Sequence, residues 1–287
     1  MTQPIRPCRS ALYLPASNPR AIEKARGLPC DAVILDLEDA VAPEAKAAAR
    51  AAAVVAFDTG GFGDRLTVLR VNGLDTAWGE ADLAAVADIG VDAVLVPKIA
   101  TAADVARYRE RLNGQKLWVM IETARSLANL QPIADAVGEG GAFAIGTNDL
   151  ALEMRCAGRA ALLPVLSLAV AAARASGLTV LDGVRNDFSD VEAFLAEAEQ
   201  GRDLGFDGKT LIHPAQIIAC NSVFTPSADQ VARAGAIVAA FDLLEHAGKG
   251  AIRLDGRMVE RLHLAEAQRT LALFAASNST YAAHKED

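Results

Sequence analysis

The sequence has little cysteine and lacks any cluster of cysteine and histidine. Its four cysteines, at positions 8, 30, 156 and 220, lie far apart and form no Cys-x-x-Cys pair. A structural zinc site needs ligands at short, regular spacing, and a disulfide framework is typical of small secreted chains. Neither is expected in a chain of 287 residues with this spacing. The cysteines are interpreted as buried free thiols, since unpaired cysteine is among the most buried residue types.

The chain also lacks an excess of positive charge and any long hydrophobic run. It has 28 Lys and Arg against 36 Asp and Glu, which gives a net charge of −8. Nucleic acid and anionic membranes attract positive surfaces, so binding to either is not expected. No apolar run reaches the roughly 18 residues of a membrane-spanning helix, and the first ten residues contain no signal-peptide core. The expected location is the cytoplasm.

Short apolar runs alternate with longer stretches that are rich in alanine and leucine. The short runs are almost continuously apolar, as is typical of parallel strands buried on both faces. Eight such strands are predicted, at residues 11–15, 32–37, 66–71, 93–98, 117–122, 142–146, 179–184 and 208–212. The stretches between them carry helix signals, such as Asn18-Pro19 at a start and Gly27 at an end.

Eight strand–helix units predict a closed (β/α)8 TIM barrel. An open doubly wound sheet is the alternative, but no Gly-x-Gly-x-x-Gly motif follows the first predicted strand. We predict a barrel domain over residues 1–222 and a C-terminal helical extension over residues 223–287, which is too short for a core of its own. In the extension, helices are expected at 226–247 and 258–276, with a hinge at 248–250, an apolar link at 251–254 and a tight turn at Asp255-Gly256. The extension is expected to pack on its own barrel or on a neighbouring subunit.

Polar residues follow the predicted strands at the barrel end where active sites of this fold lie. Glu122 and Asp149 follow the fifth and sixth strands, which are neighbours in such a barrel. Two carboxylates with no histidine or cysteine nearby favour a hard, oxygen-preferring cation such as Mg²⁺. The alternative is a pair of unconnected loop residues.

Arg70, at the end of the third strand, is the candidate cation for a substrate carboxylate, because a guanidinium stays charged and can bind two oxygens at once. It could instead be a structural arginine paired with Glu38 or Asp39, and both roles can hold together. If the second strand continues, Glu38 and Asp39 point to opposite faces, so that only one faces the ligand. Asp36 is expected in the layer beneath them.

Three further kinds of residue near these strand ends have competing interpretations. Lys98 could form a Schiff base if burial lowered its pKa, but the acidic surroundings favour metal chemistry instead. His213 is interpreted as a structural residue at a strand end rather than as a base. Trp78 and Trp118 are interpreted as packing residues.

Several short motifs occur in order along nearly the whole chain. They lie at residues 9–16, 35–41, 70–73, 96–98, 121–124, 207–209 with 212–214, and 255–260. Together they resemble the HpcH/HpaI aldolase/citrate lyase family, and most of all its citrate lyase β-like proteins and malyl- and citramalyl-CoA lyases. The resemblance implies a Mg²⁺- or Mn²⁺-dependent barrel, a homotrimer or hexamer, that acts on a 3-hydroxyacyl thioester of coenzyme A.

The resemblance also implies roles for residues in the barrel. The residues that match Glu122 and Asp149 bind the metal in that family, and Glu122 thereby contacts substrate. The residue that matches Arg70 binds substrate beside the Glu38-Asp39 pair. Arg70, Glu38 and Asp39 are therefore candidate catalytic residues.

In that family, the C-terminal segment of one subunit closes over the active site of a neighbouring subunit and supplies an acidic residue. Glu260 is the best match for this acid, and Asp255 is the second. Coenzyme A crosses the barrel mouth near the first strand and helix, so Arg20 and Lys24 are candidates for binding its phosphates. Many family members carry an acid where this chain has the neutral Asn148. This difference affects the prediction of the particular substrate more than the prediction of the metal.

The expected reaction is the reversible carbon–carbon cleavage of a thioester such as malyl-CoA or citramalyl-CoA to acetyl-CoA and a 2-oxo acid. Chelation of the substrate by Mg²⁺ would polarise an oxygen and fix its geometry. Two alternatives remain open. One is a metal-dependent pyruvate aldolase of the HpcH/HpaI type, which needs no coenzyme A, and the other is a citrate lyase β subunit that needs an acyl-carrier partner.

Overall fold

The computed structural model describes residues 6–87, 89–246 and 248–282. They divide into two compact units. Residues 8–222 form one, and the chain from Val223 onward, with the segment that precedes Cys8, forms the other. Residues 1–5 and 283–287, which the predicted domains include, lie outside the described residues. Within the described ranges, no helix has both the length and the apolar composition needed to cross a membrane.

Eight parallel strands close into a barrel in chain order. They are β1 (Ser10–Pro15), β2 (Ala32–Asp36), β3 (Leu66–Arg70), β4 (Ala93–Val96), β5 (Lys116–Ile121), β6 (Ala142–Ile145), β7 (Thr179–Asp182) and β8 (Gly208–Leu211). The barrel closes because β1 pairs with β8, with Ser10 opposite Lys209. The predicted TIM barrel is therefore confirmed, and the doubly wound sheet is excluded.

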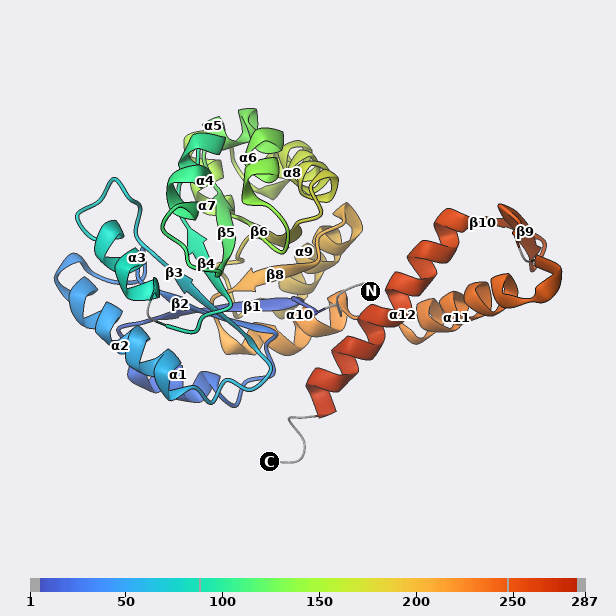
Figure 1. The fold of residues 1–287 in the computed structure, drawn as a ribbon, viewed down its shortest axis with the longest axis horizontal. Coiled ribbons are helices and arrows are strands. Elements are labelled where there is room, and N and C mark those ends of the chain that lie inside the picture. The colour runs from blue at the N-terminus through green and yellow to red at the C-terminus, as the bar shows by residue number, and fades with distance from the viewer. Residues whose placement is uncertain (1–5, 88, 247, 283–287) are drawn as a thin grey trace. The chain divides into compact units, whose positions relative to one another are not determined.

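Helices surround this barrel (Figure 1). They are α1 (Pro19–Ala25), α2 (Lys46–Thr59), α3 (Gly79–Ala87), α4 (Ala102–Arg109), α5 (Ala124–Ala128), α6 (Leu130–Val137), α7 (Thr147–Glu153), α8 (Leu163–Ala175), α9 (Val191–Leu204) and α10 (Ile217–Phe224), with short 3-10 helices at Pro43–Ala45, Arg159–Leu162 and Pro214–Gln216. Asn18 caps α1 by accepting a hydrogen bond from Ala21 N at 3.1 Å, as the Asn-Pro signal predicts.

Most strands end one or two residues earlier than predicted, because the polar residues after them leave the sheet. At β2, the carboxylate of Asp36 accepts hydrogen bonds from Glu38 N at 2.8 Å and Ala40 N at 3.1 Å, which turns the chain away from the ladder. At β4, Pro97 has no N–H to donate, and Lys98 has a φ of 53°, which no strand allows. These early ends place the polar residues on loops at the barrel mouth.

The barrel interior is packed with small and branched apolar side chains such as Ala32, Ile34 and Leu95. Trp118 is 4% exposed in this cluster, which agrees with its predicted packing role. Trp78 is half-buried, and the ammonium of Lys46 lies 5.2 Å from its ring centroid. The cysteines are free, as expected, although Cys156 is partly exposed while the other three are buried.

An ion pair ties the opposite, N-terminal ends of β1 and β2. Arg9, just before β1, donates to the carboxylate of Asp31, just before β2, through Nε at 2.8 Å and NH2 at 2.7 Å. Both residues are buried, at 5% and 3% exposure. The pair is bidentate, and it lies at the end of the barrel away from the polar mouth.

The C-terminal unit contains α11 (Ala228–Asp242), a 3-10 helix at Leu244–His246, an antiparallel pair of strands, β9 (Ala251–Leu254) and β10 (Arg257–Glu260), and α12 (Arg261–Ala282). The prediction of a helix from residue 258 was wrong, because residues 258–260 pair with β9 and the helix begins at Arg261. Asp255 and Gly256 have φ of 47° and 77°, as a two-residue hairpin turn requires. Ile252 and Val259 pair across the strands, both 6% exposed. Residue 247, the predicted end of the first helix, lies outside the described residues.

Candidate functional site

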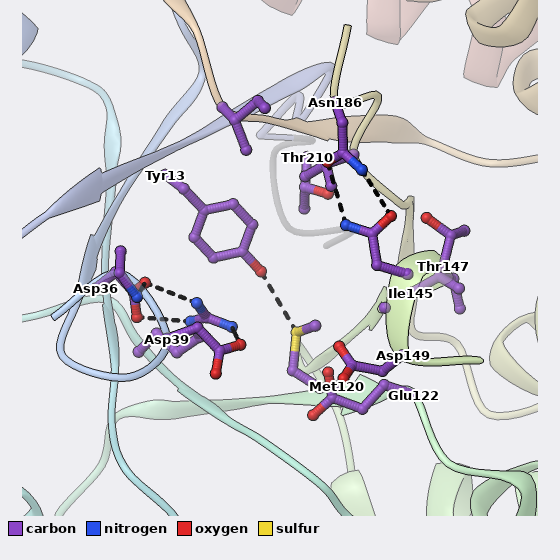
Figure 2. A pocket seen from close by; sticks show the side chains of 16 residues that line it. Tyr13, Asp36, Asp39, Met120, Glu122, Ile145, Thr147, Asp149, Asn186 and Thr210 are labelled. Carbon is purple, nitrogen blue, oxygen red and sulfur yellow. Dashed lines mark hydrogen bonds and ion pairs between the residues drawn. The ribbon is translucent and has the colours of Figure 1, made fainter. Parts of the chain in front are cut away.

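A cavity of about 310 Å³ opens where the strands end (Figure 2). Its walls come from the ends of β1, β2, β3, β5, β6, β7 and β8 and the loops that follow them. The polar lining residues are Tyr13, Asp36, Asp39, Arg70, Glu122, Thr147, Asn148, Asp149, Asn186 and Thr210. Because the C-terminal ends of the strands meet here, this is the place where TIM barrels hold their catalytic residues.

Arg70, the last residue of β3, contacts three carboxylates, of which Figure 2 labels those of Asp36 and Asp39. Its Nε and NH2 donate to the two oxygens of Asp36 at 2.7 and 2.6 Å. Its NH1 lies 2.8 Å from Glu38 Oε2 and 3.4 Å from Asp39 Oδ2. Its Cζ lies 4.9 Å from the ring centroid of Tyr13. Arg70 is only 8% exposed, so these contacts hold its guanidinium away from solvent.

Two predictions about the acids after β2 need correction. Glu38 and Asp39 do not point to opposite faces, because β2 ends at Asp36 and both side chains reach the same NH1 of Arg70. Asp36, predicted to lie in a layer beneath, is instead the bidentate partner of Arg70 and lines the cavity. The structural and ligand-binding interpretations of Arg70 thus remain compatible, since Asp36 occupies Nε and NH2 and orients NH1.

Lys98 follows β4, and its side chain is 59% exposed. Its Nζ lies 3.5 Å from Glu38 Oε1. Partial burial acts to lower the pKa of Lys98, but the carboxylates of Glu38, Asp39 and Glu122 outweigh it and raise that pKa. A Schiff-base lysine needs the opposite shift, so the structure does not favour this interpretation.

Glu122 and Asp149, the two predicted metal ligands, lie next to each other (Figure 2). Glu122 follows β5, is 2% exposed, and accepts a hydrogen bond from Lys98 N on Oε1 at 2.7 Å. Asp149 is in the first turn of α7. A Cβ on Gly146 would lie 2.5 Å from Glu122 Cβ and 2.7 Å from its Oε2, so only glycine leaves room for the carboxylate.

The electrostatics of these carboxylates favour the binding of a cation. Burial and the nearby carboxylates of Glu38 and Asp149 together raise the pKa of Glu122 to about 7, against the opposing hydrogen bond from Lys98 N. Burial likewise raises the pKa of Glu38 to about 6, although Arg70 acts to lower it. Crowded, buried carboxylates are stabilised by a cation bound between them.

A divalent cation therefore fits the residues that are present. Asp36, Glu38, Asp39, Glu122 and Asp149 supply five carboxylates against two cationic side chains. In the part of the chain that the structure describes, no three His, Cys, Asp or Glu side chains form a potential metal cluster. Two carboxylates would thus leave the other coordination positions to water and substrate oxygens, as is usual for Mg²⁺.

The barrel unit brings five predicted residues together, but the other four lie elsewhere. Arg70, Asp39, Glu122 and Asp149 line the cavity, and Glu38 contacts Arg70 beside it. Arg20 and Lys24 are exposed on α1, one turn apart, and do not line the cavity. Asp255 is in the turn of the C-terminal hairpin. Glu260 ends β10, and its N–H donates to His263 Nδ1 at 3.0 Å. The last two residues belong to the second compact unit, whereas every lining residue of the cavity belongs to the barrel.

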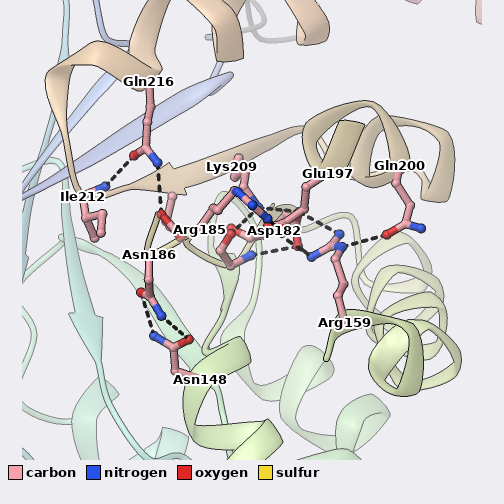
Figure 3. Close-up of polar contacts among 12 residues, drawn as sticks. Asn148, Arg159, Asp182, Arg185, Asn186, Glu197, Gln200, Lys209, Ile212 and Gln216 are labelled. Atoms are coloured by element: carbon pink, nitrogen blue, oxygen red, sulfur yellow. Dashed lines mark hydrogen bonds and ion pairs between the residues drawn. The ribbon is translucent and has the colours of Figure 1, made fainter. Parts of the chain in front are cut away.

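The sequence analysis missed Asn186, which pairs with Asn148 on the cavity wall. The two side-chain amides exchange hydrogen bonds of 3.2 and 3.0 Å (Figure 3). Asn186 lies beyond the end of β7, and its only signal in the sequence was its position after a predicted strand. The pair joins the loop after β7 to the first turn of α7, which carries Asp149.

A buried ionic network outside the cavity fixes the start of the loop after β7 (Figure 3). Lys209 and Asp182 are both fully buried. The ammonium of Lys209 contacts Asp182 Oδ2 at 2.9 Å and Glu197 Oε1 at 2.7 Å, and it also donates to the carbonyl of Gly183. Arg159 binds both oxygens of Asp182, at 3.0 and 2.9 Å. The start of the β7 loop is therefore fixed by charges outside the cavity.

The loop after β8 is fixed to the loop after β7 by Gln216. Its Nε2 donates to the carbonyl of Arg185 at 3.0 Å, and its Oε1 accepts from Ile212 N at 3.2 Å. His213 accepts a hydrogen bond from Ala215 N at 3.2 Å, and its ring stacks on Phe188 with centroids 4.3 Å apart. These contacts agree with a structural role for His213.

The fold and the cavity together define a TIM barrel with an acidic site at its mouth, and the matches that follow identify it as a lyase-type enzyme. Residues 9–214 match the family model of HpcH/HpaI aldolase/citrate lyase, and the chain belongs to this family.

Similar proteins include two from Cereibacter sphaeroides and one of known structure. The chain is 47% identical over 275 residues to a (3S)-malyl-CoA thioesterase, covering 95% of this chain and 96% of the relative. It is 34% identical over 298 residues to an L-malyl-CoA/beta-methylmalyl-CoA lyase, covering 92% and 94%. The crystal structure of CitE from Mycobacterium tuberculosis in complex with magnesium, acetoacetate and coenzyme A has a TM-score of 0.78 and 32% identity, covering 94% of this chain and all of that one.

Proposed function

We propose that the chain is a Mg²⁺- or Mn²⁺-dependent lyase that cleaves or forms the carbon–carbon bond of a 3-hydroxyacyl-CoA thioester, such as malyl-CoA or citramalyl-CoA. The observation that carries the proposal is that Glu122, Asp149 and Arg70 line one cavity. Similarity to a lyase that acts on malyl-CoA, and to a CitE structure that holds magnesium and coenzyme A, supports it.

Glu122 and Asp149 would hold the divalent cation. Once bound there, it supplies Lewis-acid polarisation of a substrate oxygen, which lowers the barrier to carbon–carbon cleavage. The support for this assignment is the oxygen-only ligand set and the excess of negative charge around it.

Arg70 is proposed to bind the substrate carboxylate through NH1. Asp36 holds Nε and NH2 and keeps the guanidinium in place. Asp39 makes the longest contact with NH1, at 3.4 Å, and its side chain is 59% exposed. A substrate carboxylate can therefore replace Asp39 on NH1 without disturbing the buried pair, and it gains a charge-assisted hydrogen bond.

Glu38 is proposed as the base that takes the hydroxyl proton of the substrate. With a pKa near 6 it is mostly ionised at neutral pH, yet basic enough to accept a proton. As the proton moves to Glu38, the hydroxyl carbon becomes the carbonyl of the departing 2-oxo acid. The bonding electrons stay on the acetyl-CoA fragment as an enolate, which an acid must protonate.

The remaining roles are proposed for residues outside the cavity. Glu260, with Asp255 as the second choice, would supply the acid from the C-terminal extension of a neighbouring subunit in a homotrimer or hexamer. Arg20 and Lys24 would bind the phosphates of coenzyme A at the barrel mouth. We propose the cytoplasm as the location, where the acyl-CoA and 2-oxo acid would be small-molecule partners.

The test is to incubate the purified protein and Mg²⁺ with malyl-, methylmalyl- and citramalyl-CoA and to measure released 2-oxo acid and free thiol in parallel. The proposal predicts 2-oxo acid without free thiol, and no product in EDTA. Absence of 2-oxo acid from all three esters, or full activity in EDTA, would overturn it.

Thioester hydrolysis is a second candidate, because the relative with 47% identity is a (3S)-malyl-CoA thioesterase. Hydrolysis would release free thiol and malate from malyl-CoA and no 2-oxo acid, so the same assay separates the two reactions. The pyruvate aldolase and the citrate lyase β alternatives also have distinct outcomes. The first would condense pyruvate with an aldehyde without coenzyme A, and the second would be active only with an acyl-carrier partner.

A further inference from the structure

Lys98 has an unusual backbone conformation next to Glu122, which lines the cavity. Its φ is 53°, and among the described non-glycine residues only Arg155 and Asp255 share a positive φ. The left-handed region disfavours residues with a Cβ, and lysine lacks the short polar side chain that lets asparagine or aspartate enter it. Such strain persists only where the surrounding structure enforces it, and it is concentrated at functional sites.

This conformation aims the backbone N–H of Lys98 at Glu122. The N–H donates to Oε1 at 2.7 Å, while Gly146 lies against Oε2, so the carboxylate is held from both sides. The next residue, Ile99, is 1% exposed and fixed in the core. With an ordinary negative φ at Lys98, either the N–H would turn away from Glu122 or Ile99 would leave its place.

The side chain of the same residue reaches the other buried acid of the site. Its Nζ lies 3.5 Å from Glu38 Oε1, while Arg70 NH1 lies 2.8 Å from Glu38 Oε2. Lys98 therefore contacts Glu122 through its backbone and Glu38 through its ammonium. Glycine would satisfy the backbone without strain, but it would leave Glu38 with one cation.

We propose that Lys98 is a positioning residue with two separable parts. Its left-handed backbone fixes the carboxylate of Glu122 for the divalent cation, and its ammonium fixes Glu38 beside Arg70. The inference rests on the proposed function, because it assumes that Glu122 binds the cation and that Glu38 acts on the substrate.

Three substitutions separate the two parts. Lys98→Gly and Lys98→Asn remove the ammonium but tolerate a positive φ, whereas Lys98→Val removes the ammonium and opposes a positive φ. Mn²⁺ binding to the full-length protein is measured by electron paramagnetic resonance, alongside thermal unfolding and turnover of malyl-CoA. We expect the Gly and Asn variants to bind Mn²⁺ within about twofold of the wild type and the Val variant to bind about fivefold more weakly, with kcat lowered in all three. If the Val variant does not fold, Lys98→Ala is measured instead, and it should also bind Mn²⁺ more weakly than the wild type and have a lower kcat.

The outcomes distinguish this inference from the proposed function. If the wild type binds Mn²⁺ and the Val and Asn variants bind it equally well, the backbone role is wrong although the metal site stands. If Lys98→Gly keeps the full kcat, the role of the ammonium is wrong. If the wild type does not bind Mn²⁺ at all, the proposed function and the inference fall together.

Discussion

Replacing Arg70 with lysine keeps a positive charge at the site but removes the planar fork that binds Asp36. In the wild type, Nε and NH2 each donate to one oxygen of Asp36, and the two side chains are 9% and 1% exposed. A lysine has one compact ammonium and cannot bind both oxygens in the same way. It also cannot hold Asp36 and present a second donor to the cavity.

The size of the effect follows from these contacts. A hydrogen bond to a charged group contributes about 1.5–3 kcal/mol, so losing one of the two buried bonds should lower the free energy of unfolding by about 2 kcal/mol. For a chain of this size that corresponds to about 4 °C in Tm. Loss of a group that stabilises developing charge typically lowers the rate by ~10²–10³, and we expect kcat/KM for malyl-CoA to fall by this amount.

Arg9 offers a matched control at the other end of the barrel. It makes the same bidentate contact with Asp31, at 2.8 and 2.7 Å, with side chains 7% and 1% exposed. Arg9→Lys should lose about the same 2 kcal/mol in denaturant unfolding, but its kcat/KM should match the wild type. Equal losses of kcat/KM in both variants would show that stability alone explains the effect. A full kcat/KM in Arg70→Lys would refute the substrate role of Arg70.

Three further predictions concern the carboxylates. Glu122→Gln should abolish Mn²⁺ binding in calorimetry and metal-dependent turnover while circular dichroism stays that of the wild type, and retained binding would contradict the ligand assignment. In EDTA, the free energy of unfolding should fall as the pH rises from about 4.5 to about 7. The pKa of Glu38 is raised to about 6 and that of Glu122 to about 7, mainly by burial. In this pH range the folded chain therefore keeps protons that the unfolded chain has released. Saturating Mg²⁺ should reduce this fall, and an identical pH profile with and without Mg²⁺ would argue against the site. Gly146→Ala places a Cβ against Glu122 and should weaken Mn²⁺ binding by about tenfold or more, because residues that orient a metal ligand typically contribute about 10–100-fold to affinity. Gly90→Ala, with open space around it, should not change Mn²⁺ binding.

The sequence was sufficient to predict the barrel and most of the cavity. Buried parallel strands have a distinct pattern of continuous apolar residues, and the residue after each strand must lie at the mouth once the barrel closes. Glu122 and Asp149 could therefore be placed together without coordinates. The ends of the strands could not be predicted, because they depend on local contacts such as those of Asp36, which takes the N–H groups of Glu38 and Ala40.

Two other features were beyond the sequence analysis for different reasons. The pairing of Asn186 with Asn148 depends on how two loops meet, which no local pattern encodes. The C-terminal hairpin, in contrast, had a readable signal in the turn dipeptide Asp255-Gly256, which has apolar residues on both sides. It was missed because residues 258–260 also suit a helix, and only the pairing of Val259 with Ile252 decides between the two structures.

The buried network around Lys209 has a consequence for how this chain can vary. Neutralising either Lys209 or Asp182 alone leaves one unbalanced charge in the network that these two residues form with Arg159 and Glu197, in a place that water does not reach, which typically costs about 3–5 kcal/mol. Replacing both at once removes the two charges together, and Arg159 and Glu197, already 3.8 Å apart, remain to neutralise each other. A library of single mutants should therefore find both positions invariant, while a library of paired mutants should recover folded apolar combinations.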